Sequence, residues 1–373
     1  MERIAALDLL RGIAALAVAV PHFIMLNAAV GWAETVSVLA VEVFFVLSGF
    51  VLGPQILRCL HSGRAGDLGV FLARRWMRTI PPYLFALALI SVIVGHVELA
   101  DLGRYALYVE NLFAQHNVND YFPVAWSLSI EEWFYIAFPG LLMAAAWCFR
   151  NNRDGFAVVV ALCFIATISL LRAAFGDLDD WGPGVRRVVA FRVDSIAYGF
   201  LLYMFMRHWV QNASDWRAAI FNPLAAAVLF IVAASFAAVL MWRIEAVQSH
   251  GAETLFPFAA AGFGISAILL AYSARHAVQQ NSRLTACCTF LGRVSYSLYL
   301  FHLSVAMVIA PHLAGLSVVV QVAVYLGVCI ALSAVFYRIF ERPVLAMRPG
   351  YRRSGEAAAI DVAPLTAPAK SAV

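Results

Sequence analysis

The stretch LLRGIAALAVAVPHF, residues 9–23, is almost entirely apolar, yet it contains Arg11 near one end and His22 near the other. An apolar run of about 20 residues is long enough to cross a bilayer as a helix. The eleven residues from Arg11 to His22 rise about 16 Å in a helix, so His22 would lie near the middle of the membrane. Because a polar side chain at that depth is costly unless it faces a partner or a cavity, the stretch predicts a membrane helix with a functional face.

The composition extends this interpretation to the whole chain. Of the 373 residues, 63% are hydrophobic and only 13% are charged, which is about half the charged fraction of a soluble domain. Apolar runs recur without the alternation of barrel strands, so we predict an all-α integral membrane protein, a bundle of about ten transmembrane helices. The predicted spans are residues 8–28, 36–57, 80–97, 126–148, 156–173, 188–207, 218–241, 254–274, 290–311 and 317–338.

The distribution of charge predicts the orientation of this bundle. Loop 58–79 is rich in arginine, whereas loop 98–125 is rich in acidic residues. Arginine-rich loops stay in the cytoplasm, so both termini are predicted to be cytoplasmic, and the net charge of +4 reflects topology rather than nucleic-acid binding. Residues 1–343 form the predicted transmembrane domain, and residues 344–373, rich in Ala, Pro and Ser, are predicted to be a disordered cytoplasmic tail. The cysteine spacing predicts no metal site.

Ionisable side chains inside the predicted spans are the candidates for chemistry, and each has a structural alternative. Arg11 could snorkel to the headgroups or pair with Asp8, and His22 could be a hydrogen-bonded tie between helices. Glu42, in AVEVFFVLSGFVLG, could orient an imidazole or be an interfacial acid. In the same stretch, Ser48 and Gly49 are typical of close helix packing rather than of chemistry.

Two further stretches place charged side chains near the ends of predicted spans. In FLARRWMRTIPPYLF, residues 71–85, Arg75 and Arg78 are three residues apart and would point the same way on a helix. Their guanidinium groups suit phosphates, and the alternative is anchoring to acidic lipids.

The stretch AWSLSIEEWFYIAFPG, residues 125–140, contains two adjacent glutamates. Ser129 and Glu132 match a capping box at a helix start, which leaves Glu131 unexplained. Ser127 and Glu131 would share one helix face.

The ninth predicted span contains LGRVSYSLYLFH, in which Tyr299 and His302 share a face. Arg192 and Asp194 in the sixth span, and Glu341 at the end of the tenth, are interpreted as polar ties between helices.

The order of these motifs resembles the acyltransferase-3 family of membrane-bound O-acyltransferases. The matching features are R-x10-H in the first helix, FFVLSGF, R-x-x-R, SLSIEEWFY, SYSLYLFH and ERP, and they extend from about residue 5 to residue 345. The chain departs from the family pattern at Leu9, where glycine is common, and at Trp133, where glutamine is common. Neither departure removes a charged group, and we expect no fused esterase-like domain of the kind that some members carry.

The resemblance implies a multi-pass enzyme of the bacterial inner (cytoplasmic) membrane that moves an acyl group, commonly acetyl, from cytoplasmic acyl-CoA to a hydroxyl of an extracytoplasmic saccharide or glycolipid. Acyl-CoA would be a co-substrate, and no bound cofactor is expected. Carried over motif by motif, Arg11, Arg75 and Arg78 would hold the coenzyme, and His22 would be the catalytic histidine.

We therefore hypothesise that His22 acts as general base on the acceptor hydroxyl and that Glu42 or Glu131 orients it. Ser127, Tyr299 and His302 are candidates for acceptor contacts or for support of the catalytic group. The alternative function is a transporter or flippase for lipid-linked saccharides. That class often shows inverted repeats, and we find none in the sequence.

Overall fold

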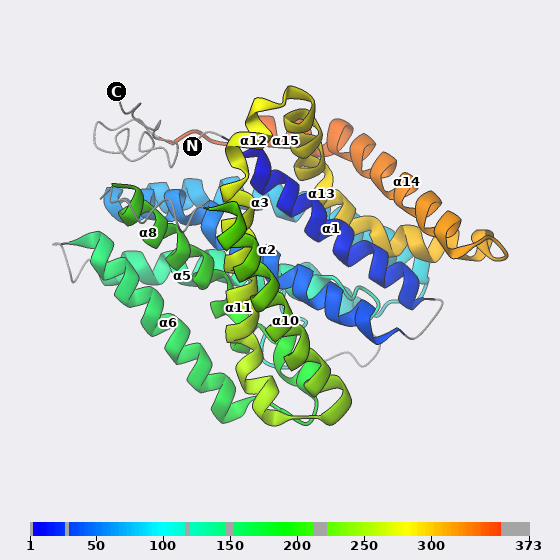
Figure 1. The fold of residues 1–373 in the computed structure, drawn as a ribbon, viewed down its shortest axis with the longest axis horizontal. Coiled ribbons are helices and arrows are strands. Elements are labelled where there is room, and N and C mark those ends of the chain that lie inside the picture. The colour runs from blue at the N-terminus through cyan, green and yellow to red at the C-terminus, as the bar shows by residue number, and fades with distance from the viewer. Residues whose placement is uncertain (1–2, 27–29, 116–119, 147–151, 212–221, 352–373) are drawn as a thin grey trace.

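The fold is known from a computed structural model, which describes residues 3–26, 30–115, 120–146, 152–211 and 222–351. Within these ranges the chain forms helices and connecting segments and contains no strand (Figure 1). The longer helices are α1 (Ala5–Met25), α2 (Gly31–Ser62), α3 (Ala65–Val94), α5 (Ala125–Ala146), α6 (Arg153–Phe175), α8 (Ala197–Gln211), α10 (Pro223–Val247), α11 (His250–Ser273), α13 (Ser282–Ile309) and α14 (Val318–Phe336). The protein is therefore all-α, as predicted.

Short helices join these elements. They are α4 (Leu99–Ala106), η1 (Gly182–Arg186), α7 (Val189–Arg192), η2 (Val193–Ile196), α12 (Arg275–Gln280), η3 (Ala310–Leu313), η4 (Tyr337–Glu341) and α15 (Arg342–Ala346). The start of α1 packs against α12, and in Figure 1 α15 appears at the same end of the molecule.

Nine helical segments of the described chain are long and apolar enough to cross a membrane, so the chain is a multi-pass membrane protein. They are Ala5–Met25, Gly31–Ser62, Ala65–Val94, Arg153–Phe175, Val189–His208, Pro223–Val247, His250–Ser273, Ser282–Leu313 and Val318–Ala346. Helix α5 occupies the position of the predicted fourth span but is not among the nine, because serines and glutamates fill its first turns.

Several helices begin earlier than the hydropathy pattern predicts. Helix α3 begins at Ala65 rather than near residue 80, so Arg75 and Arg78 lie inside a long helix, one turn apart. Helix α5 begins at Ala125, so the capping box predicted for Ser129 and Glu132 is wrong. Ser129 lies inside the helix, where its hydroxyl bonds to the carboxylate of Glu110.

Helix α2 is the centre of the bundle. It packs against α1, α8 and α11 and is largely buried, whereas α10 and α14 expose most of their apolar side chains, as expected of a lipid-facing surface. The contact with α8 is very close, because a Cβ at Gly49 would meet the carbonyl oxygen of Ile196, and one at Gly199 would meet that of Val46. The packing role predicted for Gly49 is therefore confirmed.

Buried ion pairs and a hydrogen bond join neighbouring helices inside the bundle. Arg192 is fully buried and binds the carboxylate of Glu42, joining α7 to α2. Arg172 of α6 binds Asp194 at 3.2 Å. Glu341 accepts a hydrogen bond from Ser297, joining η4 to α13. The interpretation of Arg192, Asp194 and Glu341 as polar ties is confirmed.

The segment predicted to be a disordered tail is described only in part. Residues 342–346 form α15, and the segment that follows returns to α3, where Arg74 donates a hydrogen bond of 2.7 Å to the carbonyl of Pro349. Residues 352–373 lie outside the described part of the chain, so for them the prediction stays a prediction.

Candidate active site

An inner cavity opens at the end of the bundle where α1 begins. Arginines dominate its wall: Arg3, Arg11, Arg58, Arg74 and Arg75. The ring of Tyr351 lies 4.4 Å from the guanidinium of Arg58, so the C-terminal segment forms part of the rim. This density of guanidinium groups suits a ligand with several phosphates.

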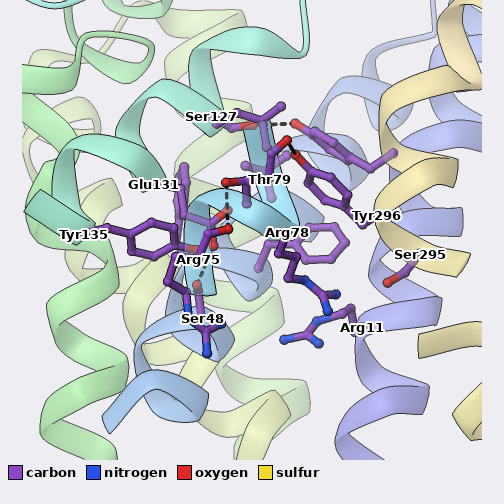
Figure 2. A pocket seen from close by; sticks show the side chains of 15 residues that line it. Arg11, Ser48, Arg75, Arg78, Thr79, Ser127, Glu131, Tyr135, Ser295 and Tyr296 are labelled. Atoms are coloured by element: carbon purple, nitrogen blue, oxygen red, sulfur yellow. Dashed lines mark hydrogen bonds between the residues drawn. The ribbon is translucent and has the colours of Figure 1, made fainter. Parts of the chain in front are cut away.

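A central cavity follows deeper in the bundle (Figure 2). Arg11 of α1 and Arg78 of α3 direct their guanidinium groups toward one another, although they carry like charges. Arg75 donates a hydrogen bond of 2.6 Å to Gln55. The structure thus brings together the three arginines that the sequence assigned to one ligand, and an anion placed among them would relieve their repulsion.

Glu131 lies in this central cavity, among the arginines. Its carboxylate accepts a hydrogen bond from Ser48 of α2 (Figure 2). The interpretation of Ser48 as a helix-packing residue is corrected, because its hydroxyl lines the cavity and binds Glu131. Ser127 lines the same cavity one turn away and hydrogen-bonds to the hydroxyl of Tyr299 at 2.6 Å, so the predicted shared face of Ser127 and Glu131 is present.

An outer cavity contains His22. It is also lined by Tyr299, Trp126, Arg186 and Arg187. The central cavity shares Arg11 and Arg75 with the inner one, and it shares Val41 and Tyr299 with the outer one. The three cavities therefore follow one another along the bundle, from the arginine-rich end to the imidazole of His22.

The partner of His22 is a second histidine. Nδ1 of His22 lies 2.8 Å from Nε2 of His302, and the two rings are stacked with an interplanar angle of 20°. His302 is fully buried, and its Nδ1 lies 2.7 Å from the backbone carbonyl oxygen of Tyr299. The hydroxyl of Tyr325, from α14, lies 3.2 Å from the carbonyl oxygens of both Ala19 and His302, which joins α1 to α13 beside the pair.

These contacts determine the tautomers of the two neutral rings. A carbonyl oxygen can only accept, so Nδ1 of His302 must hold the proton in its contact with Tyr299. Nε2 of His302 is then an acceptor, and Nδ1 of His22 must donate to it. The lone pair of His22 is left on Nε2, the nitrogen that this contact does not use, and that nitrogen can take a proton from a ligand.

Neither carboxylate predicted to orient His22 contacts it. Glu42 binds Arg192 of α7, and Glu131 lies in the central cavity with Ser48. The prediction is corrected because His302 occupies the position beside Nδ1 of His22. The alternative in which Arg11 pairs with Asp8 is not seen either. The carboxylate of Asp8 accepts a hydrogen bond from Arg3 instead.

The sequence analysis did not select two residues of the outer cavity. Arg186 and Arg187 stand together in GPGVRRVV, in the loop between the predicted spans 156–173 and 188–207. The predicted orientation puts this loop on the outer side, where arginine should be rare. That departure from the charge pattern was the signal that could have identified them. In the described residues, no group of three or more His, Cys, Asp and Glu side chains comes together as metal ligands do.

Comparison with known proteins places this arrangement in context. Residues 4–338 match a family model described as an acyltransferase domain. A peptidoglycan O-acetyltransferase, OatA, of Listeria monocytogenes is 29% identical over 178 residues, which is 43% of this chain and 28% of that protein. The O-acetyltransferase OatA of Staphylococcus aureus is 29% identical over 147 residues, 35% of this chain and 24% of that protein.

These matches cover only about a quarter of the length of either O-acetyltransferase. An uncharacterized protein of Haemophilus influenzae is 25% identical over 202 residues, 49% of this chain and 81% of that protein. No solved structure matches the chain.

Proposed function

The chain belongs to the acyltransferase family whose model spans residues 4–338, and from this premise we propose that it is a membrane O-acyltransferase. It takes an acyl group, commonly acetyl, from acyl-CoA on the cytoplasmic side and transfers it to a hydroxyl of a saccharide or glycolipid on the other side. The O-acetyltransferases among its relatives support this class of reaction.

The succession of cavities is the observation that carries the proposal. Arg11 and His22 lie on one helix, about 16 Å apart along its axis, and they line the two ends of that succession. A long coenzyme with a charged nucleotide end and a reactive thioester end fits such a path. The phosphates would bind at the arginines, and the pantetheine arm would extend through the central cavity toward His22.

The inner arginines supply binding energy for the coenzyme. Arg75 and Arg78 project from one face of α3, and Arg11 meets them from α1. Guanidinium groups bind phosphates through paired, charge-assisted hydrogen bonds. Glu131 balances part of this charge, and its bond to Ser48 holds its carboxylate within the cluster. Its role in this mechanism is therefore to position the arginines, in place of the earlier prediction that it orients His22.

His22 is the proposed general base. Its Nε2 removes the proton of the acceptor hydroxyl as that oxygen attacks the thioester carbonyl, which forms the new C–O bond. When the C–S bond breaks, the thiolate of coenzyme A leaves and takes up the proton that His22 received. His302 positions the base, because its contact with Nδ1 fixes the tautomer and ring orientation of His22, much as the third member of a catalytic triad does.

Radiolabelled acetyl-CoA tests this function. The full-length protein, reconstituted in vesicles with surface glycan from the source organism, should transfer label to glycan. His22→Ala should lower that transfer at least about a hundredfold without changing the melting temperature, since general base catalysis contributes about 10²–10⁴ in rate.

A transporter or flippase would move glycan without consuming acetyl-CoA. Full transfer by His22→Ala would end the proposed mechanism, and movement of glycan with no loss of acetyl-CoA would favour transport.

A further inference from the structure

The outer cavity is lined by positively charged side chains that the proposed reaction does not use. His22 shares this cavity with two consecutive arginines, Arg186 and Arg187. Arg186 is the last residue of η1, and Arg187 follows it directly. Two guanidinium groups thus line the cavity that holds the proposed base, at the end of the path remote from the coenzyme arginines.

Neither arginine is fully paired in the described structure. Arg186 is 5% exposed, and the only carboxylate within ion-pair distance is that of Glu34, at 4.0 Å on a half-exposed side chain. Asp120 lies within electrostatic range of Arg187, but its carboxylate already accepts a hydrogen bond of 2.5 Å from Tyr105. The Nε atoms of both arginines are buried and have no hydrogen-bond partner among the described residues.

The position of Arg186 is fixed by aromatic rings. Its guanidinium lies 5.2 Å from the ring of Trp126 and 5.6 Å from that of Trp181. Burial and the neighbouring Arg187 lower the pKa of Arg186 to about 9, so it stays charged at neutral pH. The backbone of Arg187 is also held, since its carbonyl accepts a hydrogen bond from Asn111.

We propose that the outer cavity is the acceptor site and that Arg186 and Arg187 select an anionic saccharide by binding its carboxylate or phosphate. The inference rests on the proposed acyltransferase function and adds the chemical class of the acceptor. A bound anion would pair the two guanidinium groups, and the ring of Trp126, which also lines the cavity, offers an apolar face to the sugar. Anchored in this way, the saccharide presents a hydroxyl to Nε2 of His22.

A neutral saccharide would gain none of this charge pairing and would leave the two guanidinium groups, one buried and one partly buried, with only Glu34 of the same cavity as a distant counterion. Binding sites built for a particular polar group reject analogues that lack it, because the unpaired site group keeps its desolvation cost. The site therefore discriminates by charge at the step of acceptor binding, while coenzyme binding at the inner arginines stays unaffected.

The test uses the full-length protein in vesicles, radiolabelled acetyl-CoA, and three forms of one surface glycan extract from the source organism. The first form is untreated, the second has its carboxylates reduced to alcohols, and the third has its phosphates removed with hydrofluoric acid. Label transfer should fall at least tenfold on one of the two treated extracts. A fall on the reduced extract identifies the anion as a carboxylate, and a fall on the dephosphorylated extract identifies it as a phosphate.

Variants separate this role from folding. Arg187→Gln should raise the KM for untreated extract about tenfold, leave the KM for acetyl-CoA unchanged, and remove the difference between untreated and treated extracts. Arg187→Lys should keep part of the preference, and Arg104→Gln, on the exposed surface of α4, should behave as wild type.

Equal transfer to all three extracts would overturn the anionic acceptor while leaving the acyltransferase function intact. A lack of transfer to every extract would instead overturn both.

Discussion

Two regions of the bundle bury charged side chains in different ways. Around α6, α7 and α8 the charges are paired: Arg192 with Glu42, and Arg172 with Asp194. Between α1, α3 and α13 the charged and polar groups line cavities instead, and Arg11 faces Arg78 (Figure 2). The first arrangement resembles a set of ties that hold helices together, and the second leaves charge available to a ligand. Whether a buried charge in a membrane protein has a structural or a functional role thus depends on whether it faces a counterion or a cavity.

The largest expected effect lies in the paired region. Glu42→Ala leaves Arg192 buried without a counterion, and this should cost about 3–5 kcal/mol of unfolding free energy. Thermal unfolding in detergent measures it, with Glu245→Ala on the exposed surface of α10 as control. The double variant Glu42→Leu/Arg192→Met should recover most of the loss, because it removes both charges. A stable Glu42→Ala protein would contradict the structural role and reopen a role for Glu42 in catalysis.

The tie between Glu110 and Ser129 should show itself in the pH dependence of stability. Burial raises the pKa of Glu110 from 4.5 to about 7. The unfolded chain then loses this proton at lower pH than the folded chain, so stability falls as pH rises from 4.5 to 7. Because one pKa unit corresponds to about 1.4 kcal/mol, the loss can reach about 3 kcal/mol.

Glu110→Gln keeps an acceptor for Ser129 and should remove that part of the pH dependence. Melting temperatures at pH 5 and pH 8 measure it, with Glu98→Gln on the exposed surface as control. Identical pH profiles for Glu110→Gln and wild type would show that Glu110 is not a buried acid in the folded protein.

In the cavity region, His302 should affect the rate rather than binding. His302→Leu removes the acceptor for Nδ1 of His22 and should lower kcat about a hundredfold with the acceptor KM unchanged. His302→Gln can still accept that hydrogen bond through its side-chain carbonyl and should restore much of the rate. Steady-state transfer of labelled acetyl measures kcat for both variants. An equal loss of kcat in His302→Leu and His302→Gln would show that His302 serves packing only.

Arg78 should affect coenzyme binding and leave stability unchanged. Arg78→Gln removes one of two facing guanidinium groups, so we expect the KM for acetyl-CoA to rise about thirtyfold, or about 2 kcal/mol. Its melting temperature should not fall, because relief of repulsion with Arg11 offsets lost contacts. Arg283→Gln, on the exposed start of α13, is the control. A large drop in the melting temperature of Arg78→Gln would show that Arg78 stabilises the fold, as the paired charges do, and would contradict a role in ligand binding.

The sequence by itself determined the helical membrane class, the approximate position of the spans, and the residues that carry charge within them. These properties follow from local composition and from the rise of a single helix, which placed Arg11 and His22 at the two ends of one path. It also identified the arginines that converge on the central cavity. It erred at helix ends, as in α3 and α5, because tertiary contacts extend helices into polar stretches.

Only the tertiary structure decided which charged and polar groups meet. Glu42 and Arg192 are 150 residues apart, and His22 and His302 are 280 residues apart. Such pairings depend on how each helix is rotated and on which helix lies beside it, and hydropathy does not encode either property. The two histidines, and the arginines beyond them, became a site only when α1, α13 and the segment after α6 packed together.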